Sequence, residues 1–379
     1  MTTTTWASRE TMSRLLPPTA ATGLLQMPGT GDVAVPLAPG GLSEALKIAA
    51  RHLTAAGLRP SDRVVVALNN DGVDVGTILA LAASHVTEAV VSTGPRGRMR
   101  LLRAINGIGA TALVATPTGA MDLLARLHIE FLVDPLDLGI ERIVLVGEIP
   151  SPSCERQLAM EFGARVGTVL CDPFFGIAVA HVEGDRLVAD EGHLVTAPLG
   201  EDVVAPPEPG EPYELVLRPT WSEALGDSHL RTGWVVVETA GASEDSQAGS
   251  PERNGENGER PVGLPRPSGT VGDRLLARGQ WLSLRAVTAA LRLIDGIDAW
   301  AIEVSREGTL DKITLRVAFN RPSLTENKMW AGRLRSALGA LTPVEIEVDT
   351  AADPATLTDR IIDQRGHHLG TDRQAVKAR

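Results

Sequence analysis

The stretch RIVLVGEIPSPSCERQLAMEFGARVGTVL, residues 142–170, decides the fold class of this chain. It opens at 142–146 with Arg142 followed by four apolar residues, a pattern that predicts a strand buried on both faces. A Gly/Pro turn follows, then a helix pattern over 152–162 and a second apolar strand pattern at 165–170. Two buried strands joined by a helix predict a parallel pair with a crossover connection, the repeating unit of an α/β protein.

Upstream of this stretch, the same alternation of helix and strand patterns repeats. Residues 43–56 place apolar side chains on one helical stripe, with Ser43 able to cap the start and Gly57 able to end the helix. After a Pro-containing turn, residues 63–68 form another apolar run that predicts a buried strand. Further helix or strand patterns follow at 78–84, 88–92, 99–105, 112–115 and 120–126. This half of the chain predicts a parallel sheet covered by helices.

Downstream of residue 182 the pattern changes. From 183 to 237, short alternating runs separated by Pro and Gly predict a small antiparallel sheet or barrel. Residues 240–267 are dominated by Gly, Ser, Glu, Asn and Pro, which cannot bury enough apolar surface to order a chain and so predict a mobile loop. Strand and helix patterns then occur at 274–277, 284–293, 299–305, 313–319, 323–338 and 344–348. That order predicts a small βαββαβ domain.

The predicted architecture is therefore α/β, with a large domain of parallel, helix-covered sheet plus a small antiparallel β region, followed by a small βαββαβ C-terminal domain. We predict boundaries of 1–239 for the large domain, 240–268 for the disordered loop and 269–379 for the C-terminal domain with a loose tail. Aromatic residues are 3% of the chain, so we expect the core to consist of Ala, Val, Leu and Ile.

Composition excludes several classes of function. The formal net charge is -11, so the chain lacks the dense basic field of a nucleic-acid or anionic-membrane binder. The basic cluster at 96–103 suits a solvated helix face, or a phosphate contact at a helix start. Two cysteines cannot form a disulfide framework. The N-terminus does not read as a secretory leader, and the sequence holds no apolar run of membrane-spanning length. We expect a cytoplasmic protein.

Five phrases carry a resemblance to a known family: AAGLRPSDRV (55–64), GATALVATP (109–117), VGEIP (146–150), LRTG (230–233) and GDRLLARG (272–279). In this order they resemble the acyl-adenylate-forming ligases (the ANL superfamily), and in particular phenylacetate-coenzyme A ligases. The resemblance covers about residues 30 to 350, so we expect the family's N-terminal helical region to be shortened. It implies ATP with Mg²⁺ and coenzyme A as cofactors, and an acyl or aryl group, free or as a coenzyme A or carrier-protein thioester, as the small-molecule partner.

The resemblance also implies places for individual residues. Gly147 and Glu148 would lie beside the adenine, and Phe175 and Gly176 would lie in the catalytic loop. Arg231 and Gly233 match an Arg-Thr-Gly-Asp motif, which puts Trp234 at the ribose position. Asp273 would be the hinge into a mobile C-terminal domain, near Arg278 and Gly279.

At the reactive positions this sequence departs from the family. Phe175 stands for a Tyr, Ala178 for a hydroxyl residue, Val179 for a Mg²⁺-binding Glu, and Trp234 for the Asp that holds the ribose hydroxyls. The phosphate loop would be 28–32, where Asp32 would repel a triphosphate. The segment 356–363 sits at the place of the C-terminal catalytic Lys and offers Arg360 instead, although Arg and Lys are not interchangeable. We expect ATP-dependent adenylation to be lost or strongly reduced.

Other reactive residues have two interpretations. Cys171 follows a buried strand and could face the pocket as a nucleophile or acyl attachment point, or it could be a structural buried thiol. Asp172 could replace a Mg²⁺ ligand, or form the turn before Pro173. The histidines have no ligand spacing on a shared element, so we expect no metal site.

The acyl pocket implied by the resemblance lies beside the loop 174–179. Phe174, Phe175, Ile177 and Val179 would line or close it, or would fill it themselves as a solid core. Three functions remain open: a divergent ligase-like protein that binds an acyl or aryl group or its thioester, an active AMP-forming coenzyme A ligase with a rebuilt nucleotide site, or a structural partner subunit in a homo- or hetero-oligomer.

Overall fold

The structure is a computed structural model. It describes residues 5–8, 11–12, 24–26, 35–68, 75–94, 98–239, 263–272, 274–307, 310–325, 328–339, 341–342, 344–357 and 360–365. The predicted phosphate loop at 28–32, the hinge residue Asp273 and most of the predicted mobile loop lie outside these residues.

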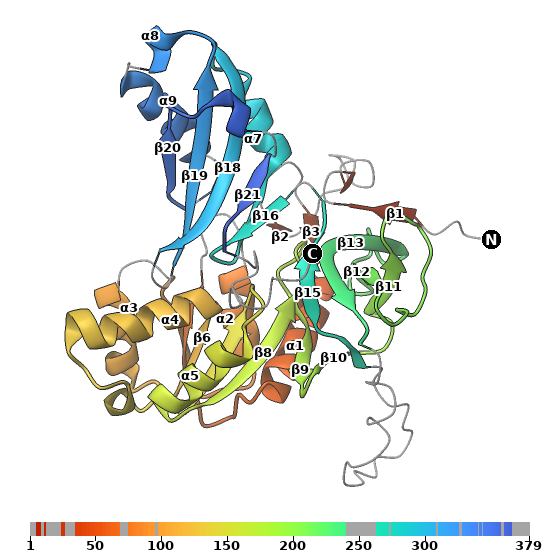
Figure 1. The fold of residues 1–379 in the computed structure, drawn as a ribbon. Helices are drawn as coiled ribbons and strands as arrows, with labels where there is room; N and C mark the ends of the chain where they lie inside the picture. The colour runs from red at the N-terminus through yellow and green to blue at the C-terminus, as the bar shows by residue number, and fades with distance from the viewer. Residues whose placement is uncertain are drawn as a thin grey trace.

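An eight-stranded sheet forms the large domain (Figure 1). Its order is β14 (Gly263–Pro265), β10 (Arg186–Ala189), β9 (Ala178–Glu183), β8 (Arg165–Cys171), β7 (Arg142–Val146), β6 (Ala112–Ala115), β4 (Arg63–Ala67) and β5 (Ala89–Ser92). The five strands from β8 to β5 are parallel, and β9, β10 and β14 continue the sheet antiparallel. The predicted parallel, helix-covered sheet is confirmed.

Helices cover both faces of this sheet because neighbouring residues of a strand point to opposite sides. Val64 and Val66 join a core with α1 (Pro39–Ala55) and α2 (Val75–Ser84), whereas Val65 joins a separate core with the helices of the other face. Those helices are α3 (Arg98–Ile108), α4 (Pro117–Arg126), the π-helical turn η3 (Leu127–Phe131), the 3-10 turn η4 (Pro135–Leu138) and α5 (Pro152–Phe162). The apolar runs quoted above are thus strands buried on both faces.

A smaller sheet lies beside the large one (Figure 1). Its strands are β1 (Thr5–Ala7), β13 (Ser228–Val237), β12 (Pro212–Leu217) and β11 (Leu194–Pro198), with β15 (Pro267–Thr270) also paired to β13. Two details differ from the prediction. The β1–β13 pair is parallel, and β10, expected in the small sheet, belongs to the large one. A separate hairpin pairs β2 (Leu24–Gln26) with β3 (Val35–Leu37).

The predicted disordered loop at 240–268 is wrong at its C-terminal end. Residues 263–265 form β14 and residues 267–270 form β15. Each pairs with a strand that is distant in sequence, β10 or β13, and the composition of the segment does not indicate that pairing. Arg186 bonds both flanks of the segment 240–262: its Nη1 donates to Oε1 of Glu238 (2.7 Å) and its Nε to the carbonyl of Gly263 (3.2 Å). The described residues on either side of that segment, Glu238 and Gly263, are therefore held near each other by one side chain.

The C-terminal domain contains the six elements of the predicted βαββαβ order and two further strands, β17 and β21, that the sequence did not predict. A hairpin of β16 (Arg274–Ala277) and β17 (Gln280–Ser283) leads to α7 (Leu284–Leu291), followed by a four-stranded sheet in the order β20–β19–β18–β21. Its elements are β18 (Ile297–Glu307), β19 (Leu310–Phe319), α8 (Pro322–Thr325), α9 (Lys328–Gly339), β20 (Ile346–Asp349), η5 (Pro354–Thr356) and β21 (Ile361–Asp363). In Figure 1 this domain stands above the part of the large domain where α4 and β6 are labelled, and α4 contacts β19.

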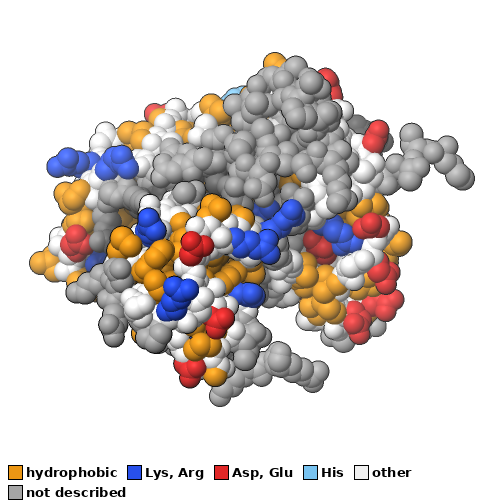
Figure 2. Space-filling model, turned by 90° about the horizontal axis from the view of Figure 1, so that it is seen from above, with side chains coloured by type: hydrophobic (Ala, Val, Ile, Leu, Met, Phe, Trp, Pro, Cys, Tyr) orange, Lys and Arg blue, Asp and Glu red, His pale blue; other side chains and the backbone are white. Residues whose placement is uncertain are grey.

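Charged side chains of both signs are scattered over the surface. Figure 2 shows Lys and Arg interspersed with Asp and Glu over the described part of the face seen from above. Among the described residues, no helix is both long and apolar enough to cross a membrane.

Candidate functional site

The turn between β8 and β9 occupies the predicted catalytic-loop position, and Asp172 organises it. Its Oδ1 accepts the N–H groups of Phe174 (2.9 Å) and Phe175 (2.6 Å), and its Oδ2 accepts the N–H of Ile177 (2.9 Å). Gly176 adopts a φ of 70°, and a Cβ there would lie 3.0 Å from a valine side chain of α2. Both carboxylate oxygens of Asp172 are engaged in shaping the turn, as a turn-forming residue requires.

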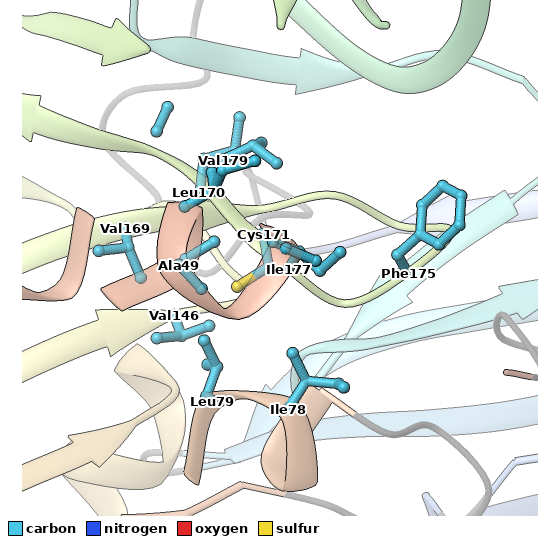
Figure 3. Packing of buried hydrophobic residues seen from close by; sticks show 14 of the residues in the cluster. Ala49, Ile78, Leu79, Val146, Val169, Leu170, Cys171, Phe175, Ile177 and Val179 are labelled. Carbon is cyan, nitrogen blue, oxygen red and sulfur yellow. The ribbon is translucent and has the colours of Figure 1, made fainter. Parts of the chain in front are cut away.

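The four acyl-pocket candidates lie in the core of the large domain. Phe174, Phe175, Ile177 and Val179 are each at most 1% exposed and belong to the same apolar cluster as α1 and α2. Phe175 packs edge-to-face against Trp221, with ring centroids 5.7 Å apart. Figure 3 shows several of these side chains with their neighbours from both helices. This is the packing expected if the side chains fill the pocket themselves.

Cys171 is part of the same buried cluster (Figure 3). Burial, with a smaller contribution from the neighbouring Asp172, raises the pKa of its thiol well above the usual 9.0. A nucleophilic cysteine needs the thiolate form, which this environment disfavours. The geometry therefore supports the structural interpretation of Cys171.

Glu148 follows β7 and is buried at the boundary between the two domains. Its Oε1 accepts the hydroxyl of Thr118 (2.9 Å) and its Oε2 accepts the N–H of the same residue (3.0 Å). Burial, and then the charge of Asp311 in β19, raise the pKa of Glu148 from its usual 4.5 to about 7. The carboxyl group that would lie beside an adenine is thus electrostatically coupled to the C-terminal domain.

Small residues allow the domains to approach closely at this point. Gly279, in the turn of the β16–β17 hairpin, has a φ of 70°, and a Cβ there would lie 2.7 Å from Cγ2 of Thr116. A Cβ on Gly147 would lie 3.7 Å from Cα of Gly279. The preceding residue, Arg278, donates from Nε to the carbonyl of Asp311 (2.7 Å) and so ties the hairpin to β19.

An aromatic pair continues the contact between the domains. Trp234, on β13, is 2% exposed and meets Trp281, on β17, edge-to-face with ring centroids 5.2 Å apart. The hairpin spans both cores: Leu276 and Trp281 pack with the large-domain core, while Leu275 packs with the C-terminal core. We call these contacts the interdomain joint, formed by Thr116, Thr118, Gly147, Glu148 and Trp234 on the large domain and by Gly279, Trp281 and Asp311 opposite.

Arg231 is held by carboxylates within the small sheet. Its Nη1 donates to Glu214 (2.7 Å) and its Nη2 to Asp202 (3.1 Å), and its guanidinium lies over the ring of Trp6 at 5.2 Å. Glu214 also accepts the N–H of Gly233 at 2.9 Å. These contacts hold the part of β13 just before Trp234 and use the charge of Arg231 locally.

Comparison with known proteins shows which solved structures share this fold. No protein-family model and no curated protein matches the sequence, but solved structures match the fold. A 2-hydroxyisobutyryl-CoA ligase in complex with 2-HIB-AMP and CoA, in the thioesterification state, superposes with a TM-score of 0.74 at 17% identity, covering 94% of this chain and 79% of that chain. The chain has the fold of the acyl-adenylate-forming ligases.

Other proteins of this ligase fold match less completely. The amide bond synthetase McbA from Marinactinospora thermotolerans gives a TM-score of 0.59 at 17% identity, over 89% of this chain and 67% of that chain. A malonyl-CoA ligase with methylmalonyl-CoA and AMP bound gives 0.56 at 15% identity, over 88% and 70%.

The superposition differs between structures of the same ligase in different states. The same 2-hydroxyisobutyryl-CoA ligase gives a TM-score of 0.55 in the postadenylation state and 0.56 in an open conformation, against 0.74 in the thioesterification state. Sequence identity is 16–17% throughout, so the difference comes from conformation. This chain therefore superposes better on the structure in the thioesterification state than on the other two structures of that ligase.

Within the ligase fold, the predicted site residues separate into two groups. Gly147, Glu148 and Trp234 lie in the interdomain joint, whereas the loop 174–179 lies in the large-domain core. Arg360, which the resemblance puts near the place of a catalytic Lys, lies over the ring of Trp300 at 4.5 Å and donates to the carbonyl of the same residue (3.1 Å). Its charge is thus used within the C-terminal domain.

Sequence reasoning missed one cluster of titratable residues. His52 and His181 approach through their Nδ1 atoms (3.1 Å), and Asp190 lies 3.9 Å from Nε2 of His52 and 3.8 Å from Nδ1 of His193. Burial lowers the pKa of His52 to about 4, and Arg51 pairs with Asp190.

In the part of the chain that the structure describes, no group of His, Cys, Asp or Glu could hold a metal ion. The first two histidines come from α1 and β9, so spacing along the chain gave no signal.

Proposed function

We propose that this protein uses the ligase fold without making acyl adenylates, and that it acts as a partner subunit in acyl or aryl thioester metabolism. The observation that carries the proposal is the Trp234–Trp281 pair. At the position where the family resemblance implies a carboxylate for the ribose hydroxyls, two indole rings pack edge-to-face across the domain boundary. A buried ring pair offers no acceptor for two hydroxyl groups.

The catalytic-loop position supports the same proposal. Adenylation requires a cation to neutralise charge that grows on the phosphates, and Mg²⁺ binds through oxygen ligands. Ala178 and Val179 supply no oxygen and are completely buried, and the carboxylate of Asp172 is engaged with backbone N–H groups. Removing one transition-state donor commonly costs about 10²- to 10³-fold in rate, so the combined losses leave little adenylation.

Pyrophosphate exchange tests this proposal. The purified protein should show no ATP–pyrophosphate exchange with a panel of aryl and alkyl acids, and calorimetry with ATP and Mg²⁺ should show no saturable heat. An intact coenzyme A ligase, assayed in parallel, validates the panel. The variant Trp234→Asp asks whether the ribose position alone blocks activity; we expect it to stay inactive, because the loop at 174–179 is unchanged. Exchange above background with any acid would restore the alternative of an active AMP-forming ligase with a rebuilt nucleotide site.

A second candidate function is binding of an acyl or aryl thioester, presented by coenzyme A or a carrier protein. It is favoured by the domain arrangement, which is more similar to the thioesterification state of the neighbouring ligase than to its other states. A thermal shift with phenylacetyl-coenzyme A that exceeds the shifts with coenzyme A and with phenylacetate would support this candidate. Equal shifts would favour the partner role without a ligand.

A further inference from the structure

The turns η3 and η4 and the end of α5 expose a group of large apolar side chains on the large domain. Ile129 is 74% exposed, Leu132 83%, Leu136 58% and Met160 74%. Leu132, Leu136 and Met160 line a shallow hollow of about 540 Å³. Single exposed apolar residues, such as Ile129, are ordinary, but exposed apolar side chains gathered around one depression are typical of an interaction site. We call this surface the apolar hollow.

The backbone at Leu132 is unfavourable for a leucine. The residue adopts φ 51° and ψ 41°, the left-handed region that glycine enters freely and that a side chain with a Cβ resists. It directly follows the π-helical turn 127–131, and such turns are frequent at functional sites. Because the side chain is 83% exposed, burial within this chain does not compensate the strain. The side chain of Leu132 therefore faces solvent and is accessible to another molecule.

The rim of the apolar hollow is acidic. Asp134 and Glu161 line the hollow together with His128. Glu130 and Asp137 are exposed on the same turns, and Arg126 is the one guanidinium of residues 126–138. That guanidinium already faces Asp122 and Glu130, and His128 pairs with Glu161 at 3.4 Å. Arg156, exposed one turn before Met160, is the nearest further cation along α5.

This charge pattern decides which occupant fits. A second copy of the chain, docked by the same surface around a two-fold axis, would bring two acidic rims together. An anionic lipid surface would be repelled as well. Apolar side chains flanked by Lys or Arg would bury the exposed leucines and pair with the rim carboxylates.

We propose that the apolar hollow is the docking site for a protein partner that presents an amphipathic helix with an apolar ridge flanked by basic residues. The proposal specifies the partner role proposed above and rests on it. Its test is separate, because peptide binding at η3 and α5 and pyrophosphate exchange are independent measurements: either can fail without the other.

The test uses the full-length protein and two synthetic amphipathic helical peptides that share the same leucine face, one flanked by Lys and one by Glu. Affinity is measured by calorimetry, and the footprint by hydrogen exchange. The Lys-flanked peptide should bind and protect residues 127–137 and 160–161, while the Glu-flanked peptide should bind at least about tenfold more weakly.

Two variants make the experiment specific. Leu132→Gly removes the presented side chain and suits the left-handed backbone, so the fold should be retained and affinity for the Lys-flanked peptide should fall about tenfold. Leu293→Ala changes a leucine that is 87% exposed on the C-terminal domain and should leave affinity unchanged. Equal binding of both peptides, a footprint elsewhere, or full affinity in Leu132→Gly would overturn the proposal. Self-association through the hollow, seen in sedimentation and lost in Leu132→Gly, would overturn it in favour of a second copy.

Discussion

The loop 172–179 and the interdomain joint differ in the side chains that they bury: the loop buries apolar side chains, and the joint buries a carboxyl group. Both correspond to positions that the family resemblance assigns to nucleotide handling. In the loop, side chains such as Phe175 and Val179 are completely buried, and the remaining carboxylate, that of Asp172, serves the turn. In the joint, Glu148 keeps a buried carboxyl group, and Trp234 adds a ring that meets the other domain.

The difference teaches that one fold can treat such positions in two physical ways. In the loop, apolar burial replaces hydrogen bonding, so the segment should contribute stability like any core. In the joint, a buried polar group is retained at an electrostatic cost, which is tolerable because Thr118 supplies two hydrogen bonds. We therefore expect the loop to respond to cavity-forming substitutions and the joint to respond to pH.

The largest expected effect is that of Phe175→Ala. Because the ring is completely buried and packed against Trp221, its removal should cost about 3 to 5 kcal/mol in the free energy of unfolding, measured by urea denaturation. Leu293→Ala, an exposed control, should change that free energy by less than about 0.5 kcal/mol. A loss of about 1 kcal/mol or less for Phe175→Ala, together with new binding of an acyl thioester, would mean that the ring closes a pocket instead of filling a core.

The second effect is the pH dependence of the joint. The pKa of Glu148 is raised by burial and by Asp311, so the folded state favours the protonated form. The stabilisation is therefore complete below pH 4.5 and is lost as the pH rises through about 7, with a size of roughly 3 kcal/mol.

Unfolding free energies of the protein and of Glu148→Gln, compared between pH 5 and pH 8, measure this contribution. The protein should lose more stability than the variant as the pH rises, because glutamine does not titrate but can still accept from Thr118. Parallel pH profiles for the two proteins would contradict the assigned environment of Glu148.

The smallest effect is the coupling within the tryptophan pair. A double-mutant cycle with Trp234→Ala and Trp281→Ala should give an interaction energy of about 0.5 to 1.5 kcal/mol, as is usual for edge-to-face aromatic pairs. A second cycle between Trp234→Ala and Leu293→Ala should give no coupling, since distant sites add. Zero coupling in the first cycle would show that the rings do not join the two domains in solution.

The sequence by itself determined the elements whose signal is local. The strand patterns at 63–68 and 142–146 are β4 and β7, the helix pattern at 152–162 is α5, and the six predicted elements of the C-terminal domain are present. That residues 175, 178, 179 and 234 stand at the family's reactive positions and differ from them is a prediction from the resemblance. Periodicity and turn residues report these features because burial of one segment depends mainly on its own side chains.

Tertiary structure alone decided which segments meet. The strands at 263–270 exist because β10 and β13 accept them at their edges, and short polar segments carry no local sign of that pairing. His52 and His181 are 129 residues apart in sequence and in contact in space. The role of Glu148 depends on Thr118 and Asp311, and that of Trp234 on Trp281. A residue type states what chemistry is available, but the neighbours that set its pKa, its packing and its accessibility come from distant parts of the chain.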